Sequence, residues 1–270
     1  DDWGFNGFVV TDYTGINEMV EHGVGDLQAV SALALRAGVD MDMVGEGLLT
    51  TLKKSLDEGK ISMADIDNAV RRILTAKYEL GLFDDPYKYC DVNRPKSDVF
   101  TDEHRSFARK VSAESMVLLK NTDSVLPLKK SGTVALIGPL ANSAVNMAGT
   151  WSVATKQELS NPLLDGLKTV VGDSVNVLYA KGSNLDYDLE FEKRATMFGK
   201  DIPRDERTNK QLLDEALSIA RKSDVIIAAI GESAEMSGES SSRTNLEIPQ
   251  AQKDLLNALM KTGKPVVIVL

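Results

Sequence analysis

The sequence places an acidic residue, Asp12, where a short apolar run gives way to a loop. The run of Phe8, Val9 and Val10 follows a glycine and is typical of a strand buried on both faces, and a helical pattern begins at Ile16. α/β enzymes hold catalytic side chains at such strand ends, so Asp12 is a candidate for acid–base or nucleophilic chemistry. An aspartate just before a helix can also serve only as its N-cap, and spacing alone does not separate the two roles.

A second group of carboxylates lies in a glycine- and serine-rich loop, residues 231–244. Its three glutamates are Glu232, Glu235 and Glu239. The loop follows a continuous apolar strand, and loops at the carboxyl ends of strands face the ligand in open α/β sheets. Arg243 in the same loop could steer a charge or clamp the loop, although loop arginines usually meet solvent. The loop is therefore the second candidate for chemistry.

Helical patterns and short strands alternate along the chain, which predicts a parallel α/β architecture, either a barrel or a doubly wound sheet. The predicted strands are 8–10, 39–43, 133–138, 175–180, 225–230 and 265–270. The predicted helices are 16–20, 26–37, 48–58, 63–80, 104–119, 209–222 and 250–262. The long polar stretch 182–208 has no clear period and is expected to run over the surface.

A proline-bearing, polar and aperiodic segment separates two regular parts of the chain. We place the first domain at residues 1–83, a linker at 84–100 and the second domain at 101–270. The last predicted strand stops with the sequence, so the second domain is expected to be incomplete at its C-terminus.

Composition excludes several classes of function. The 270 residues carry a net charge of −9 with a pI near 4.9, which argues against a nucleic acid or an anionic membrane surface as partner. The sequence has no apolar run of about 18 residues that could span a membrane. The single cysteine, Cys90, excludes an internal disulfide but does not identify the compartment.

Three further patterns lack residues that their chemistry requires. The loop at Gly138-Pro139 follows a strand, as nucleotide-binding loops do, but has neither G-x-G-x-x-G nor a P-loop lysine. The serines at 240–242 have no nucleophile elbow of the G-x-S-x-G type. His22 and His104 belong to no cluster with metal-ligand spacing, so no metal site is predicted.

Five motifs in order resemble the two-domain β-glucosidase group of family-3 glycoside hydrolases. They are GFNGFVVTDYTGI, AGVDMDM, GLFDDPY, LLKN…LPL and ESSSRTNLEIP. The resemblance implies the C-terminal end of a (β/α)8 barrel followed by an α/β sandwich. It also implies that Asp12 is the catalytic nucleophile. Tyr13 stands where many members have tryptophan, a difference that bears on the sugar subsite rather than on the chemistry.

Retaining hydrolysis needs two carboxyl groups that lie about 5–5.5 Å apart. The resemblance also indicates which residue carries the second one. In the family the acid/base glutamate lies a few residues before a motif like NLEIP, so the resemblance implies that Glu239 is the acid/base. Glu232, at the mouth of the strand, is the second choice and more plausibly structural; Glu18, six residues after Asp12, is the third. Tyr13 and Arg243 are the candidates for substrate binding.

The implied activity is exo-acting hydrolysis of terminal β-D-glucosyl residues with retention, without a cofactor, on an oligosaccharide or β-glucoside. The alternatives are a β-xylosidase, a β-N-acetylglucosaminidase or a non-catalytic sugar-binding module. A periplasmic or secreted location is implied by the resemblance alone, and the oligomeric state is left open. Because most of a barrel would lie upstream of Asp1, residues 1–270 alone are expected to be inactive and to self-associate.

Overall fold

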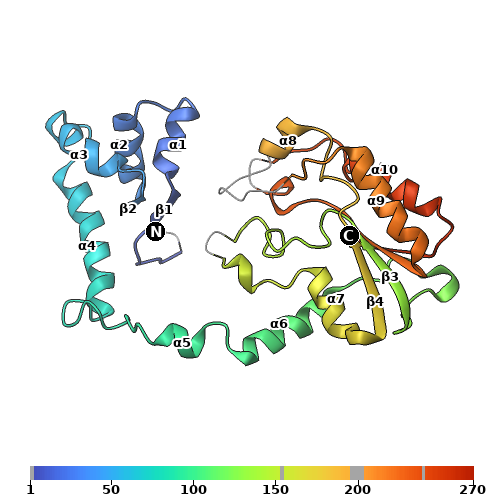
Figure 1. Ribbon diagram of the computed structural model, residues 1–270. Coiled ribbons are helices and arrows are strands. Elements are labelled where there is room, and N and C mark those ends of the chain that lie inside the picture. Colours follow the sequence, from blue (N-terminus) through green and yellow to red (C-terminus); the bar gives the residue numbers. More distant parts are fainter. Residues whose placement is uncertain (1–2, 153–154, 195–203, 239–240) are drawn as a thin grey trace. The chain divides into compact units, whose positions relative to one another are not determined.

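The computed structural model describes residues 3–152, 155–194, 204–238 and 241–270. The chain forms two compact units, Asp1–Met116 and Val117–Leu270. Each unit has its own hydrophobic core. Strands pair in parallel in both units, which confirms the predicted α/β class (Figure 1).

The first unit is built from two paired strands and the helices that follow them. Its elements are β1 Val10–Tyr13, α1 Gly15–Glu21, α2 Leu27–Ala37, β2 Met41–Met43, α3 Gly47–Asp57, α4 Met63–Glu79, α5 Arg94–Asp98 and α6 Asp102–Ser115. Its core is formed by helices α1 to α4, with Ile16, Val30 and Leu35 among its most buried side chains. Helices therefore account for most of the buried surface of this unit.

Local sequence explains where the first unit's helices begin and end. Asp26 caps α2, because its Oδ1 accepts a hydrogen bond from the backbone N–H of Ala29 at 2.8 Å. Ser62 and Asp65 form a reciprocal capping box at the start of α4. Gly81, with φ of 72°, follows the end of α4 as predicted.

The first strand differs from its prediction. We expected residues 8–10 to be buried on both faces, but the strand is Val10–Tyr13 and Val10 is 41% exposed. Within the described residues β1 pairs only with β2, so one strand edge and much of the apolar surface stay uncovered. As a result Asp12 belongs to the strand itself rather than to the loop after it.

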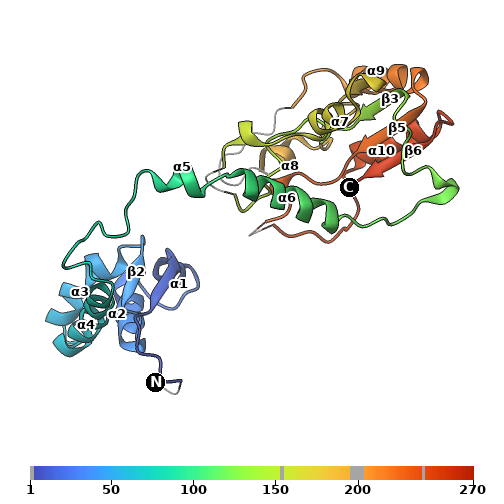
Figure 2. The same cartoon turned by 90° about the horizontal axis from the view of Figure 1, so that it is seen from below.

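The second unit is a four-stranded parallel sheet in the order β4-β3-β5-β6, with helices on both faces (Figure 2). Its regular elements are β3 Gly132–Ile137, α7 Leu163–Val171, β4 Val175–Ala180, α8 Leu189–Arg194, α9 Asn209–Lys222, β5 Val225–Ala229, α10 Gln250–Met260 and β6 Val266–Val269. Single 3-10 turns occur at Thr122–Ser124, Gln157–Leu159, Gly172–Ser174 and Ala234–Met236. Helices α9 and α10 pack on one face and α7 on the other.

Other segments of the chain also differ from the expectations. Helix α6 stops at Ser115 instead of Leu119, because Met116 adopts an extended conformation. Helix α7 was not predicted, since Gly166 and a β-branched end lower its helix propensity. The stretch 182–208 is not only a surface excursion: Asn184 and Leu185 are buried within it.

Among the described residues, each helix is too short or too polar to span a lipid bilayer.

Candidate active site

Asp12 lies near the carboxyl end of β1 with an exposed side chain. Its Oδ1 accepts a hydrogen bond from the backbone N–H of Tyr13 at 2.7 Å. The N-cap residue of α1 is Thr14, so Asp12 does not have the capping role that spacing alone allowed. An exposed carboxylate held by one backbone donor at a strand end is chemically available as a nucleophile or a base.

Backbone strain accumulates where β1 and β2 end. Thr14, Val44 and Glu46 all have positive φ, at 56°, 68° and 55°. Left-handed conformations cost a non-glycine residue of the order of 1–3 kcal/mol and occur preferentially at functional sites. The strain is supported by cross-strand hydrogen bonds: the N–H of Thr14 donates to the carbonyl of Met43, and the N–H of Met43 donates to Thr11 Oγ1, both at 2.9 Å.

The neighbours of Asp12 differ in how firmly they are held. Tyr13 is 61% exposed, so its ring is open to a ligand beside the carboxylate. Glu18 lies on the exposed side of α1 and accepts a hydrogen bond from Thr14 Oγ1 at 3.5 Å. Asp42, in the middle of β2, accepts hydrogen bonds through Oδ2 from the N–H groups of Gly47 and Leu48 in the first turn of α3.

An ion pair between a buried aspartate and a partly exposed arginine fixes the start of β1 to α4. The side chain of Asp40 is fully buried, and its Oδ2 accepts a hydrogen bond from the N–H of Val9 at 2.8 Å. Arg72 donates to both carboxylate oxygens of Asp40, with Nη2 to Oδ1 at 2.6 Å. This contact raises the pKa of Arg72 above its usual value. Asp40 has no role predicted from the sequence, because its partner Arg72 comes 32 residues later.

We expect Arg72→Met to lower the free energy of unfolding of the first unit by about 1–3 kcal/mol, because Asp40 stays buried with a backbone donor alone. Arg71→Met is the matched control: Arg71 is an exposed neighbour, and a change within about 0.5 kcal/mol is expected. Urea unfolding of both variants measures the difference. Equal effects of the two substitutions would contradict a role for the ion pair.

The loop that follows β5 is held by Arg243. Its Nη2 donates to the carbonyls of Glu247 at 2.6 Å and Asn245 at 3.1 Å, and its Nη1 forms an ion pair with Glu232. Arg243 thus clamps the loop, one of the two roles that the sequence allowed. Glu232 is occupied by this pair. Glu239 lies outside the described residues, so its position as the acid/base stays a prediction.

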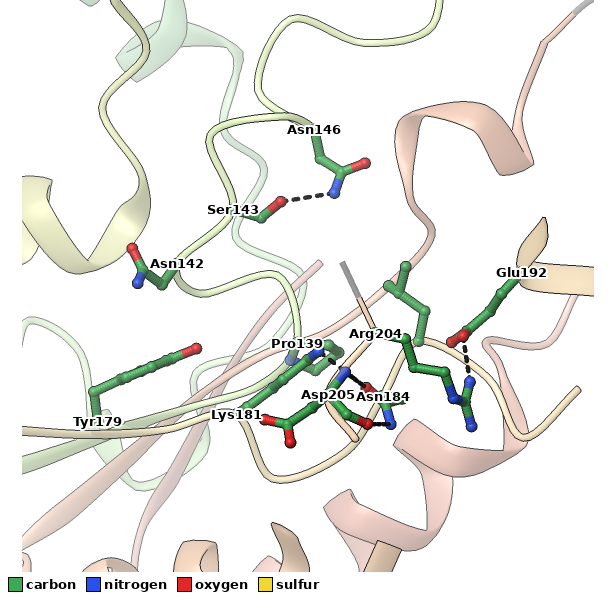
Figure 3. Close-up of a pocket in the computed structure, with 11 residues that line it drawn as sticks. Pro139, Asn142, Ser143, Asn146, Tyr179, Lys181, Asn184, Glu192, Arg204 and Asp205 are labelled. Carbon is green, nitrogen blue, oxygen red and sulfur yellow. Dashed lines mark hydrogen bonds and ion pairs between the residues drawn. The ribbon is translucent and has the colours of Figure 1, made fainter. Parts of the chain in front are cut away.

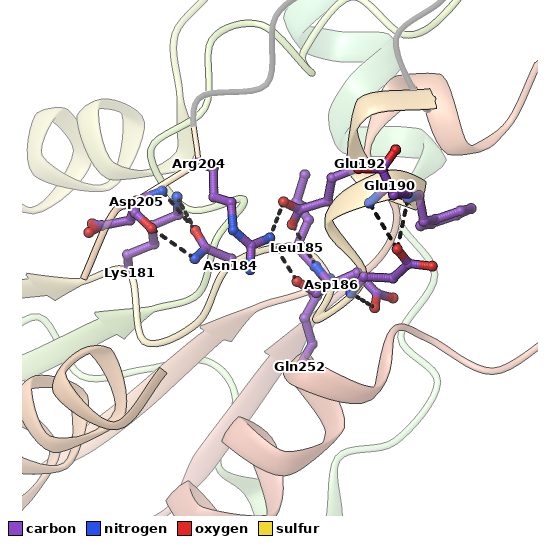
Figure 4. Close-up of polar contacts among 11 residues, drawn as sticks. Lys181, Asn184, Leu185, Asp186, Glu190, Glu192, Arg204, Asp205 and Gln252 are labelled. Carbon is purple, nitrogen blue, oxygen red and sulfur yellow. Dashed lines mark hydrogen bonds and ion pairs between the residues drawn. The ribbon is translucent and has the colours of Figure 1, made fainter. Parts of the chain in front are cut away.

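A polar cavity of about 270 Å³ lies beyond the carboxyl ends of β3 and β4 (Figure 3). Lys181, half-buried in its wall, donates through Nζ to Asn184 Oδ1 at 2.9 Å. Burial lowers the pKa of Lys181. Asn184 also exchanges hydrogen bonds with the backbone of Asp205 (Figure 4). Hydrogen bonds from the side chain and the backbone N–H of Arg207 hold the pKa of the Asp205 carboxyl well below its usual range. The sequence does not reveal this network, because its central contact joins Asn184 to Asp205, 21 residues later, in a segment without periodicity.

A second cavity of about 470 Å³ lies against the loop after β5. Its walls are Asp186, Asp188, Phe191, Ser242, Arg243, Thr244, Asn245, Glu247, Ile248, Pro249, Gln250 and Lys253. Within the described residues no group of three or more His, Cys, Asp or Glu side chains could hold a metal ion.

Both units are parallel α/β structures, and the exposed carboxylate of Asp12 lies near the carboxyl end of a strand. This combination is typical of α/β enzymes. Residues 1–76 match the glycosyl hydrolase family 3 N-terminal domain, and residues 116–270 match the family's C-terminal domain. The chain belongs to glycosyl hydrolase family 3, which confirms the resemblance.

Proteins that are similar to this chain include some named as β-glucosidases and some named as β-xylosidases. A periplasmic beta-glucosidase of Salmonella typhimurium is 43% identical over 100% of the chain and 36% of its own length. A beta-xylosidase of Formosa agariphila is 36% identical over 100% of the chain and 36% of its own length. The crystal structure of a β-glucosidase from Listeria innocua in complex with isofagomine matches 99% of this chain and 34% of its own, with 30% identity and a TM-score of 0.80. The chain spans about a third of the length of these relatives.

Proposed function

We propose that the protein is an exo-acting retaining β-glycosidase that releases terminal β-D-glucosyl residues. The observation that carries the proposal is Asp12: an exposed carboxylate at the carboxyl end of a parallel strand, in the part of the chain that matches the family's N-terminal domain. The identity to a protein named periplasmic beta-glucosidase supports glucose as the sugar. The same name supports a periplasmic or secreted location.

The proposed reaction is a double displacement in which Asp12 is the nucleophile and Glu239 is the general acid and base. Asp12 attacks the anomeric carbon and forms a glycosyl ester, while the Glu239 carboxyl group gives its proton to the departing oxygen. Glu239, now ionised, takes a proton from water, which attacks the anomeric carbon and releases the sugar and Asp12. Tyr13 and Arg243 are proposed to contact the sugar or to hold the loop around it. Two carboxyl groups suffice, so the reaction needs no cofactor.

The domain assignment is part of this proposal. We assign residues 1–83 to the end of a (β/α) barrel, 84–100 to a linker and 101–270 to an α/β sandwich. The sugar site is then completed by barrel residues that lie upstream, as in a barrel whose site is built from all eight strand-end loops.

The sugar specificity is tested by comparing kcat/KM for 4-nitrophenyl β-glucoside and β-xyloside, in the protein as its gene encodes it. We expect the glucoside to be preferred by about tenfold or more, since a site that hydrogen-bonds the C6 hydroxymethyl loses those bonds with xylose. The 36% identical beta-xylosidase makes xylose the second candidate. A preference for the xyloside would assign that specificity instead.

The role of Glu239 is tested by leaving-group dependence. Glu239→Ala should reduce kcat/KM for phenyl β-glucoside by about 100-fold or more, yet affect 2,4-dinitrophenyl β-glucoside far less, because a good leaving group needs no proton. Added azide should restore turnover of the activated substrate by replacing water as nucleophile. Equal losses on both substrates would instead indicate Glu232, or a structural role for Glu239.

A further inference from the structure

The loop that carries the proposed acid/base begins at Gly231, and one buried side chain holds that point. Gln252, on α10, is fully buried. Its Oε1 accepts a hydrogen bond from the N–H of Gly231 at 2.8 Å, and its Nε2 donates to the carbonyl of Gly231, also at 2.8 Å. The same Nε2 donates to the carbonyl of Leu185 at 3.0 Å. One carboxamide therefore joins the end of β5 to the loop after β4, and Figure 4 shows it beside Leu185.

Two further contacts hold the loop farther along. Asn146, in the loop after β3, accepts a hydrogen bond from the N–H of Ala234 through Oδ1 at 2.8 Å and donates to Ser143 through Nδ2 at 2.8 Å. Gly238 packs so closely on Thr150 that an added Cβ would lie 2.8 Å from Thr150 Oγ1. The loop is thus attached at its root and again on the approach to residue 239.

A carboxamide is well suited to this position. A backbone N–H and a carbonyl of the same residue need an acceptor and a donor side by side, and a glutamine side chain offers both. Once the three bonds are lost, buried backbone groups of Gly231 and Leu185 remain unsatisfied, and the loop is expected to shift until water reaches them. A general acid works only within hydrogen-bond reach of the departing oxygen, so such a shift impairs proton donation before it impairs nucleophilic attack.

We propose that Gln252, with Asn146 as a second anchor, is a positioning residue for the acid/base of this loop. The inference rests on the proposed function, in which Glu239 protonates the leaving oxygen. It assigns to Gln252 no contact with the substrate. Its effect is on the orientation of the loop, and so on leaving-group dependence rather than on nucleophilic attack by Asp12.

The test compares Gln252→Met with Leu259→Ala in the protein as its gene encodes it. Methionine keeps the length of the side chain and removes all three hydrogen bonds. Leu259 is fully buried in the core on the same helix, so its truncation destabilises the unit without touching the loop. For each variant, kcat/KM is measured with 2,4-dinitrophenyl and with phenyl β-glucoside, and the ratio of the two values is compared with that of wild type.

We expect Gln252→Met to raise this ratio by about tenfold or more, since small misplacements of catalytic groups carry costs of that size. Leu259→Ala should leave the ratio unchanged while lowering the melting temperature. A Gln252→Met ratio within about twofold of wild type would overturn the proposal. If Gln252→Met does not fold, Asn146→Ala decides: a raised ratio supports the anchoring and an unchanged ratio overturns it.

Glu239→Ala, measured in the same assays, separates the acid/base role of Glu239 from the positioning role of Gln252. A raised ratio in Glu239→Ala with an unchanged ratio in Gln252→Met refutes the positioning role and leaves the proposed function intact. A raised ratio in Gln252→Met with an unchanged ratio in Glu239→Ala refutes Glu239 as the acid and supports positioning of another acid of the same loop. Absence of β-glycosidase activity in the wild-type protein would overturn both.

Discussion

Asp12→Asn should lower kcat for β-glucoside hydrolysis by roughly 1,000-fold or more, the scale of effect that removal of a nucleophile has in other enzymes. Asparagine is nearly isosteric, but its amide does not form the glycosyl ester. The fold should be unaffected, because the hydrogen bond that Asp12 accepts comes from the adjacent N–H of Tyr13 and an amide oxygen accepts it equally well. Steady-state kinetics and thermal melting measure the two properties separately.

Glu21→Gln is the charge-matched control for this substitution. Glu21 is exposed at the end of α1, in the same unit, and both variants remove one negative charge. We expect the control to keep the activity and the melting temperature of wild type. If Asp12→Asn kept a tenth of the wild-type kcat, Asp12 would not be the nucleophile.

Gly138→Ala should destabilise the second unit by about 4 kcal/mol or more. Gly138 lies at the end of β3 with φ of 141°, a conformation that side-chain-bearing residues rarely adopt. An added Cβ would lie 1.9 Å from the carbonyl oxygen of Ala229 on β5, and neither strand can move without breaking the sheet. We expect the second unit of the variant to be largely unfolded at ambient temperature, so that urea titration shows no cooperative unfolding transition for it.

Gly166→Ala, in α7, is the matched glycine control. Apart from its chain neighbours and the backbone of its own helix, no heavy atom of the described residues lies within 4 Å of the position that its Cβ would take. Alanine there should leave stability unchanged or raise it by up to about 1 kcal/mol, because it favours the helix. Gly138→Ala unfolding at the same urea concentration as wild type would show that the β3–β5 approach is not as close as described.

The close approach at Gly138 also explains a sequence pattern that pointed elsewhere. A glycine after a buried strand suggested a nucleotide-binding loop, and the missing phosphate-binding residues argued against it. The structure supplies the reason for the glycine: the backbone of β5 occupies the space where a side chain would stand.

Elements with strong local signals were predictable from the sequence. Helix α9 and strand β4 match their predicted bounds, because the helix has a capping box at Thr208 and the strand is a short apolar run. The exposure of β1 was not predictable, since burial of a strand depends on which neighbours cover it and its own residues do not specify them.

The candidate site was predictable in part. The position of Asp12 at a strand end follows from the apolar run before it, whereas its freedom from a capping role depends on where α1 begins. The ion pair of Asp40 with Arg72 and the contacts of Gln252 join residues far apart in the chain. In the sequence Gln252 is one polar residue in an amphipathic helix, and only the packing of α10 against β5 and the β4 loop reveals it as buried.

The most direct test of the account is covalent trapping with 2,4-dinitrophenyl 2-deoxy-2-fluoro-β-glucoside, in the protein as its gene encodes it. The fluorine slows both steps and the activated leaving group restores the first, so the glycosyl ester accumulates. We expect inactivation with one fluoroglucosyl group per protein, and mass spectrometry of the digest should place it on Asp12. An adduct on another carboxylate, or full activity with no adduct after prolonged incubation, would contradict the assignment of Asp12 as the nucleophile.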